Sequence, residues 1–178
     1  MSSKESKRTS NNITDGTQIS FQKDTQMKVL FLDIDGVLNS SKFIHENQEK
    51  IINMTSLLSR GTAEIDPICL TRIRKVVETT GCQIVISSSW RILHPLDEIK
   101  DMLKELGWEA PIIDITPRKR SGIRGDEVKA WLNDHLEVKQ FACVDDDSDF
   151  HPDQNLVQTS WENGILDSHV EMLINILK

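Results

Sequence analysis

The sequence feature that most constrains the fold is a set of three short apolar runs, each followed at once by Asp or Ser. The first covers residues 28–32 and is followed by Asp33, the second covers residues 83–86 and precedes three serines, and the third covers residues 140–144 and precedes Asp145. Continuous apolar runs of this length are typical of strands buried on both faces of a parallel sheet. Because the carboxyl ends of such strands meet where open α/β sheets bind ligands, we expect these polar residues at one site.

The segments between these runs carry apolar residues at helical spacing. A helix is expected to follow Asp66-Pro67 and to stop near Gly81, because Pro suits a first helical turn and Gly a helix end. Three more helical segments and two weaker strand candidates complete the pattern: residues 96–106, 128–135 and 170–177, and residues 112–115 and 155–159. Alternating strands and helices predict an α/β fold with a central parallel sheet and helices on both faces.

The 178 residues suit one domain, with 38% hydrophobic and 28% charged residues. Residues 1–26 are polar with isolated apolar positions, so we predict a flexible polar tail there. The ordered domain is expected over residues 27–178, with a small hairpin or helical flap inserted at about 39–66.

Charge and cysteine content limit the cellular setting and the partners. A formal net charge of −7 argues against a broad basic face that coats nucleic acid, but Arg118, Lys119, Arg120 and Arg124 form a local basic cluster. No apolar run is long enough to span a membrane, and the first residues lack a signal-like apolar segment. Three cysteines without a CxxC pair predict a reducing compartment without disulfides. We therefore expect a cytoplasmic protein with no membrane partner.

The acidic strand ends indicate phosphoryl chemistry. Clustered carboxylates repel one another unless a hard cation lies among them, and a set of oxygen ligands suits Mg²⁺. With phosphate charge neutralised, one carboxylate can attack phosphorus while a second gives and takes protons. A hydroxyl and a cationic side chain are expected to hold the phosphoryl oxygens.

Residues Phe31–Asn39 resemble the opening motif of haloacid dehalogenase (HAD) superfamily phosphatases. The resemblance implies a three-layer α/β/α Rossmann-like fold and a phosphoric monoester hydrolase that works through an aspartyl-phosphate. It also implies that Asp33 is the nucleophile and a metal ligand. Asp35 would be the general acid/base, and its backbone carbonyl would bind Mg²⁺.

The second motif of the superfamily is a Ser or Thr at a strand end. Counting seven residues from Gly81 gives Ser88, whereas counting from the end of the apolar run gives Ser87. We favour Ser88 as the catalytic hydroxyl and keep Ser87, together with Ser89, as substrate-binding residues.

The remaining motifs supply a cation and further acids. Arg124 occupies the place of the basic residue that precedes the last motif, with Lys129 as an alternative one turn into the helix. Asp145-Asp146 resembles the acidic fourth motif, which implies that Asp146 binds the metal and that Asp145 supports it.

Residues 27–177 resemble a narrower branch, the small HAD domains of "Swiss army knife" RNA-repair proteins. The match depends on Ser88–Arg91, on Arg124–Val128, on the three aspartates from Asp145 and on Trp161–Ile165. Arg91 is a candidate phosphate contact or a structural ion pair, and Trp90 is expected to pack rather than stack on a base. Neither insertion slot of the chain holds a full cap domain, so the site should be open.

An open site and the repair-branch resemblance favour a nucleic-acid 3′-phosphate end or a nucleotide as substrate. The sequence leaves three alternative functions open: a receiver-like signalling domain, a phosphate-binding domain without turnover, and a phosphatase of small metabolites. Receivers carry the acceptor Asp on a middle strand, whereas Asp33 and Asp35 both follow the first strand.

Overall fold

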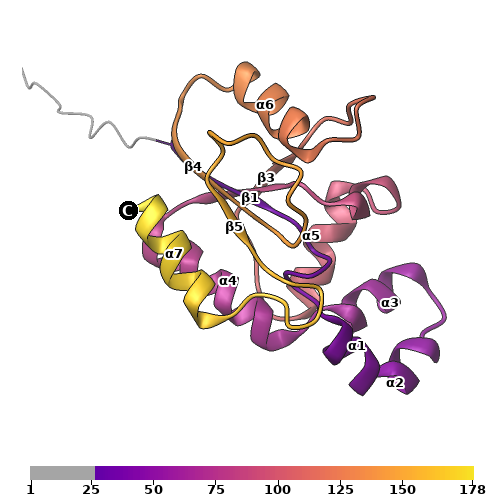
Figure 1. The fold of residues 1–178 in the computed structure, drawn as a ribbon. Helices are drawn as coiled ribbons and strands as arrows, with labels where there is room; N and C mark the ends of the chain where they lie inside the picture. Colours follow the sequence, from indigo (N-terminus) through magenta and orange to yellow (C-terminus); the bar gives the residue numbers. More distant parts are fainter. Residues whose placement is uncertain (1–26) are drawn as a thin grey trace, which may run out of the picture.

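A computed structural model describes residues 27–178, so the predicted tail of residues 1–26 lies outside the described part. The five described strands form one parallel sheet in the order β3-β2-β1-β4-β5 (Figure 1). Their bounds are β1 Met27–Leu32, β2 Gln83–Ile86, β3 Ile112–Ile115, β4 Val138–Asp145 and β5 Leu156–Gln158. The predicted α/β fold with a central parallel sheet is confirmed.

All the helices but the last lie between strands along the chain, and the last helix follows β5. Their bounds are α1 Ser41–Glu46, α2 Gln48–Ile52, α3 Leu57–Glu64, α4 Pro67–Thr80, α5 Leu96–Glu105, α6 Arg124–Asp134 and α7 Asp167–Leu177, and a short 3₁₀ helix covers Ser89–Ile92. Within residues 27–178, none of these helices combines the length and the apolar character needed to cross a membrane.

The two faces of the sheet are covered by different helices, which gives three layers (Figure 1). Alternate residues of β1 point to opposite faces, as the strand period requires. Leu30 and Leu32 join the larger core with α4, α5 and α7, whereas Val29 and Phe31 join a smaller core under α6. The strand is therefore buried on both faces, which explains its unbroken apolar sequence.

Helix α4 begins and ends as its sequence predicts. The Asp66 side chain accepts a hydrogen bond from the backbone N–H of Ile68, and Pro67 occupies the first helical turn. Gly81 ends the helix with φ 69°, a left-handed conformation that favours glycine. Because Cys82 alone lies between Gly81 and β2, this helix end fixes where the second strand starts.

The predicted flap at about 39–66 consists of the three short helices α1, α2 and α3, which lie together at one end of the molecule (Figure 1). Its last helix packs on α5, where Gly61 permits close approach: a Cβ there would lie 2.9 Å from Met102 Cε. The flap is thus tied to the core by a helix contact and is too small to form a separate cap domain.

Candidate active site

The loop after β1 carries the first two acids of the site. Asp33 is 4% exposed, and its backbone N–H donates to Val144 O at 3.1 Å, so β1 and β4 stay paired up to this residue. Gly36 turns the chain with φ 66°, and a Cβ there would lie only 2.4 Å from Asp146 Cγ. The DxDG sequence therefore needs a glycine at this position for two reasons: the turn requires a positive φ, and a side chain would collide with the Asp146 carboxylate.

Three aspartates converge at the carboxyl edge of the sheet. Asp33, Asp145 and Asp146 each offer a carboxylate oxygen, and these oxygens all lie within 4.8 Å of one another. Among the described residues, Asp33 Oδ1 and Asp145 Oδ2 are buried without a hydrogen-bond partner. Burial raises the pKa of both carboxyls above the ordinary 3.8, and the Asp33 charge raises that of Asp145 further. Such a set of crowded, unsatisfied oxygens fits a hard divalent cation.

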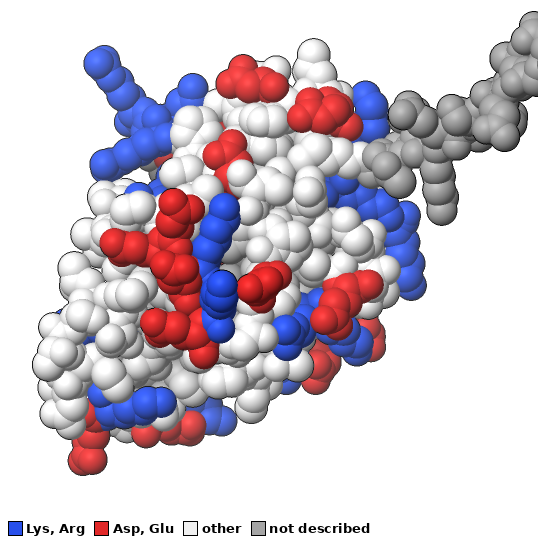
Figure 2. All heavy atoms as spheres, turned by 180° about the vertical axis from the view of Figure 1, so that it is seen from behind, with Lys and Arg blue, Asp and Glu red and all other residues white. Residues whose placement is uncertain are grey.

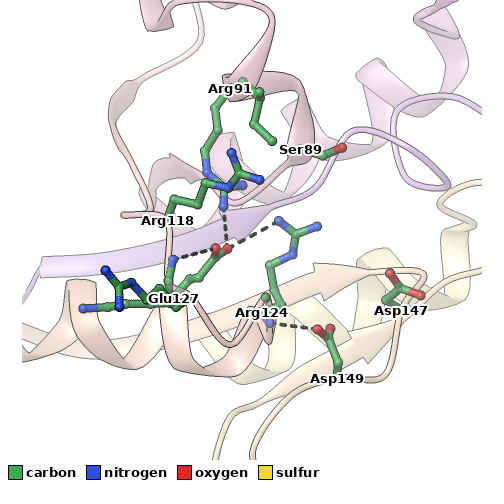
Figure 3. A pocket seen from close by; sticks show the side chains of 11 residues that line it. Ser89, Arg91, Arg118, Arg124, Glu127, Asp147 and Asp149 are labelled. Carbon is green, nitrogen blue, oxygen red and sulfur yellow. Dashed lines mark hydrogen bonds and ion pairs between the residues drawn. The ribbon is translucent and has the colours of Figure 1, made fainter.

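Arg124 faces these acids from the first residue of α6. Its Nε lies 3.2 Å from Asp145 Oδ2, and one terminal nitrogen lies 3.9 Å from Asp33 Oδ1. The backbone N–H of Arg124 donates to Asp149 Oδ2 at 2.8 Å, which caps the helix from the loop after β4 (Figure 3). The Arg124 guanidinium is therefore held beside Asp33, the predicted nucleophile, because the first turn of α6 is anchored by Asp149.

The sequence did not reveal that Glu127 connects the basic residues of the site. Its buried carboxylate accepts a hydrogen bond from Arg91 and lies 3.8 Å from an Arg124 nitrogen (Figure 3). It also accepts from the backbone N–H of Lys119 at 3.2 Å. Arg91 further donates to the carbonyl of Ser88, and together with its ion pair to Glu127 this holds its guanidinium at the wall of the site. A Glu three residues after Arg124 carries no sequence signal that separates it from an exposed helix residue.

The three serines occupy different positions. The backbone N–H of Ser87 donates to Leu32 O at 2.8 Å, so sheet pairing continues to this residue, and its buried hydroxyl has no hydrogen-bond partner. Ser88 is the first residue beyond the sheet, and its hydroxyl, beside Asp33, lowers the pKa of that carboxyl against the larger effect of burial. Ser89 is exposed and lines the cavity described next. Of the three, Ser88 is the one brought to the predicted nucleophile.

Both oxygens of the Asp35 carboxylate accept hydrogen bonds from side chains. Trp90 Nε1 donates to Oδ2 at 2.9 Å, and Asn39 Nδ2 donates to Oδ1 at 2.9 Å. Trp90 was expected to pack, and it does, with 9% of its surface exposed. Its hydrogen bond to Asp35 and the role of Asn39 were not predicted, because neither follows from local sequence.

A cavity of about 580 Å³ opens beside this constellation. It is lined by Ser89, Arg91, Ile92, Arg118, Lys119, Arg120, Gly122, Arg124, Glu127, Asp147 and Asp149 (Figure 3). The basic residues of its rim come from the loop between β3 and α6, where Figure 2 shows positive side chains projecting from one edge of the molecule. Lys129 is not brought together with Arg124; it lines a neighbouring cavity on the exposed side of α6.

Replacing Asp145 by Asn is expected to stabilise the metal-free protein at neutral pH. The folded-state pKa of Asp145 is raised, so the stability that its carboxyl contributes is present below pH 3.8 and is lost as the pH rises through the folded pKa. Asn removes this loss while keeping the oxygen that accepts from the Asp147 N–H. Urea unfolding in chelator should show a higher unfolding free energy for the variant at about pH 8 and little difference at about pH 4. A variant less stable than wild type at both pH values would contradict the expectation that the charged Asp145 carboxylate destabilises the metal-free fold.

An all-parallel sheet with aspartates, a serine and an arginine at its carboxyl edge is the arrangement of HAD domains. A family model described as "HAD domain in Swiss Army Knife RNA repair proteins" matches residues 29–170, and the chain belongs to this family. Membership points to a phosphatase-type hydrolase, and HAD domains generally use Mg²⁺, for which the cluster of three aspartates is suited. Neither the curated proteins nor the solved structures contain a match to this chain.

Proposed function

We propose that the protein is a Mg²⁺-dependent phosphomonoester hydrolase that works through an acyl-phosphate (aspartyl-phosphate) on Asp33. The observation that carries the proposal is the cluster of Asp33, Asp145 and Asp146, two of them buried, which faces Arg124 at the sheet edge. Bound Mg²⁺ would be held by these carboxylates with the Asp35 carbonyl, and it would neutralise phosphate charge so that an anion can approach an anion.

In the first step, an oxygen of the Asp33 carboxylate attacks phosphorus, and the bond between phosphorus and the leaving oxygen breaks. The leaving oxygen takes the electron pair and receives a proton from the Asp35 carboxyl. In the second step, water attacks phosphorus, the bond to Asp33 breaks, and the water proton passes to the Asp35 carboxylate. Arg124 and Ser88 are suited to hold the phosphoryl oxygens in both steps.

The position of Asp35 favours hydrolysis over the signalling alternative. A receiver-like domain keeps its phosphate, so it has no need of a second carboxylate that two side chains hold in place after the first strand. The direct test is release of inorganic phosphate from p-nitrophenyl phosphate by the purified protein with Mg²⁺. A protein that becomes phosphorylated on Asp33 without turning over would be the receiver-like or phosphate-binding alternative.

We infer that the substrate is a nucleic-acid 3′-phosphate end or a nucleotide rather than a small sugar phosphate. The exposed side chains of Arg118, Lys119 and Arg120 rim the cavity, and Lys129 extends this basic surface along α6. An adjoining cavity of about 340 Å³ with an apolar wall of Ile92, Ile115 and Pro117 could take a ribose or base. The chain carries a net charge of −7, so a local basic group such as Arg118, Lys119 and Arg120 is suited to hold a polyanion at one place. The cytoplasm is the proposed setting, since all three cysteines are buried free thiols.

Neutralising the basic rim by Arg118→Gln, Lys119→Gln and Arg120→Gln together is expected to raise KM for a 3′-phosphorylated oligonucleotide about tenfold at low salt. Fewer phosphate contacts should also flatten the dependence of KM on salt. Hydrolysis of p-nitrophenyl phosphate should stay within about twofold of wild type, because that substrate has no backbone to bind.

The matched control removes three exposed lysines away from the cavity, Lys50, Lys75 and Lys139, each by Gln. It changes the net charge equally and should leave KM for the oligonucleotide nearly unchanged. Equal losses on both substrates in the rim variant would place the loop in the catalytic machinery. Rapid sugar-phosphate turnover without oligonucleotide activity would identify a small-metabolite phosphatase instead.

A further inference from the structure

We propose that Trp90 is a positioning residue that holds the Asp35 carboxylate for proton transfer. This inference rests on the proposed function, because it gives Asp35 the role of general acid/base. It assigns to the indole N–H a task in the reaction, although Trp90 itself touches neither phosphorus nor the leaving group.

The hydrogen bonds of Asp35 fix the rotation of its carboxylate. The Trp90 Nε1 donor and the Asn39 Nδ2 donor approach different oxygens, each at 2.9 Å. Asn39 is itself fixed, because its Oδ1 accepts from the backbone N–H of Gly36 at 2.9 Å. Each carboxylate oxygen keeps a second acceptor position, where a proton can be held or received. Proton transfer depends on such orientation, so a carboxylate free to rotate would be a poorer acid and base.

The indole is itself held firmly by the core. Trp90 lies in the 3₁₀ helix that starts after Ser88, and its backbone N–H donates to Ser88 Oγ at 3.3 Å. The far edge of its ring packs against α3, where a Cβ on Gly61 would come within 3.1 Å of Trp90 Cζ3. The His94 ring lies on another side with a centroid distance of 5.7 Å. The phosphate-binding serine and the donor to Asp35 therefore belong to one rigid turn.

A second tryptophan, Trp131, also donates its indole N–H to an aspartate, but away from the candidate active site. Trp131 Nε1 donates to Asp114 Oδ2 at 2.7 Å, and its ring is 2% exposed and stacks on His135. A buried indole N–H needs an acceptor, and either aspartate would serve that need. The Trp131 hydrogen bond can only be structural, whereas the Trp90 hydrogen bond ends on the proposed acid/base. Trp131 is therefore a matched control for Trp90.

The test compares Trp90→Phe with Trp131→Phe in the full chain with Mg²⁺. Phe keeps an aromatic ring in each core position and removes the N–H donor. For Trp90→Phe, kcat on an alkyl phosphate should fall about tenfold to a hundredfold with KM within about twofold, because a poor leaving group needs the acid. With p-nitrophenyl phosphate, the first step should stay fast and the second should slow. Rapid mixing should then show a burst of p-nitrophenolate approaching one per protein molecule.

Trp131→Phe should behave like wild type in both assays at a temperature where both variants are folded by circular dichroism. Equal effects of the two variants, or equal losses on both substrates without a burst, would overturn the proposal. A double-mutant cycle covers the case in which Trp90→Phe is merely less stable. In an Asp35→Asn background, Trp90→Phe should cause no further loss of kcat, whereas an undiminished loss there would show that Trp90 does not act through Asp35. Failure of wild type to release phosphate would refute the proposed function itself.

Discussion

Asp33→Asn is expected to lower kcat for every phosphomonoester at least about 10³-fold, because the amide cannot attack phosphorus. Asp33 is buried, with an Arg124 terminal nitrogen 3.9 Å from its Oδ1 and the Ser88 hydroxyl beside it, where a phosphoryl group would be held. The substitution changes no volume and removes a charge that burial disfavours. The metal-free fold should therefore be at least as stable as wild type, which thermal unfolding in chelator can measure.

Asp153→Asn is the matched control for this substitution. It changes the same charge on the exposed loop between β4 and β5, away from the three clustered aspartates. Its kcat should stay within about twofold of wild type. Trapping with radiolabelled phosphate ester and acid quench should label wild type and leave Asp33→Asn unlabelled. Residual activity of Asp33→Asn within tenfold of wild type would remove Asp33 from the role of nucleophile.

The fold was predictable because its signals are local. Strands β1, β2 and β4 each contain a continuous apolar run, and α4 carries both a start at Asp66-Pro67 and a stop at Gly81. The flap was less clear in the sequence, since its three helices have five to eight residues each and bury few side chains. Helices this short owe their stability to tertiary contacts, such as that of Gly61 with α5, which sequence patterns do not report.

The site was predictable in part for the same reason. The residues at strand ends were found because the parallel sheet brings them together wherever its strands stop. Register among the three serines needed the structure, because pairing of the Ser87 N–H with Leu32 extends the sheet by one residue. The contacts of Glu127 with Arg91 and of Trp90 with Asp35 were missed, since they join residues that lie 36 and 55 positions apart in the chain. Local patterns predict which residues reach an edge and leave open how their side chains pair there.

Removing divalent cations is expected to eliminate hydrolysis, and Mg²⁺ is expected to restore it fully. The Arg124 guanidinium faces the cluster of Asp33, Asp145 and Asp146. It lies beside Asp33 and Asp145 but donates no hydrogen bond to the buried oxygen of either carboxylate. Without a cation, an anionic substrate would meet uncompensated carboxylates, so both binding and attack should fail.

The measurement is phosphate release from p-nitrophenyl phosphate in excess chelator and after titration with Mg²⁺ or Ca²⁺. Both ions should raise the melting temperature, because each binds the folded state better than the unfolded chain. Ca²⁺ should support little turnover, since its longer and less regular coordination loosens the alignment of nucleophile, phosphorus and leaving group. Asp146→Asn should weaken the rise in melting temperature with Mg²⁺, while the control Asp153→Asn should not. Full activity in excess chelator would mean that Arg124 alone neutralises the phosphate, and the three aspartates would then need another explanation.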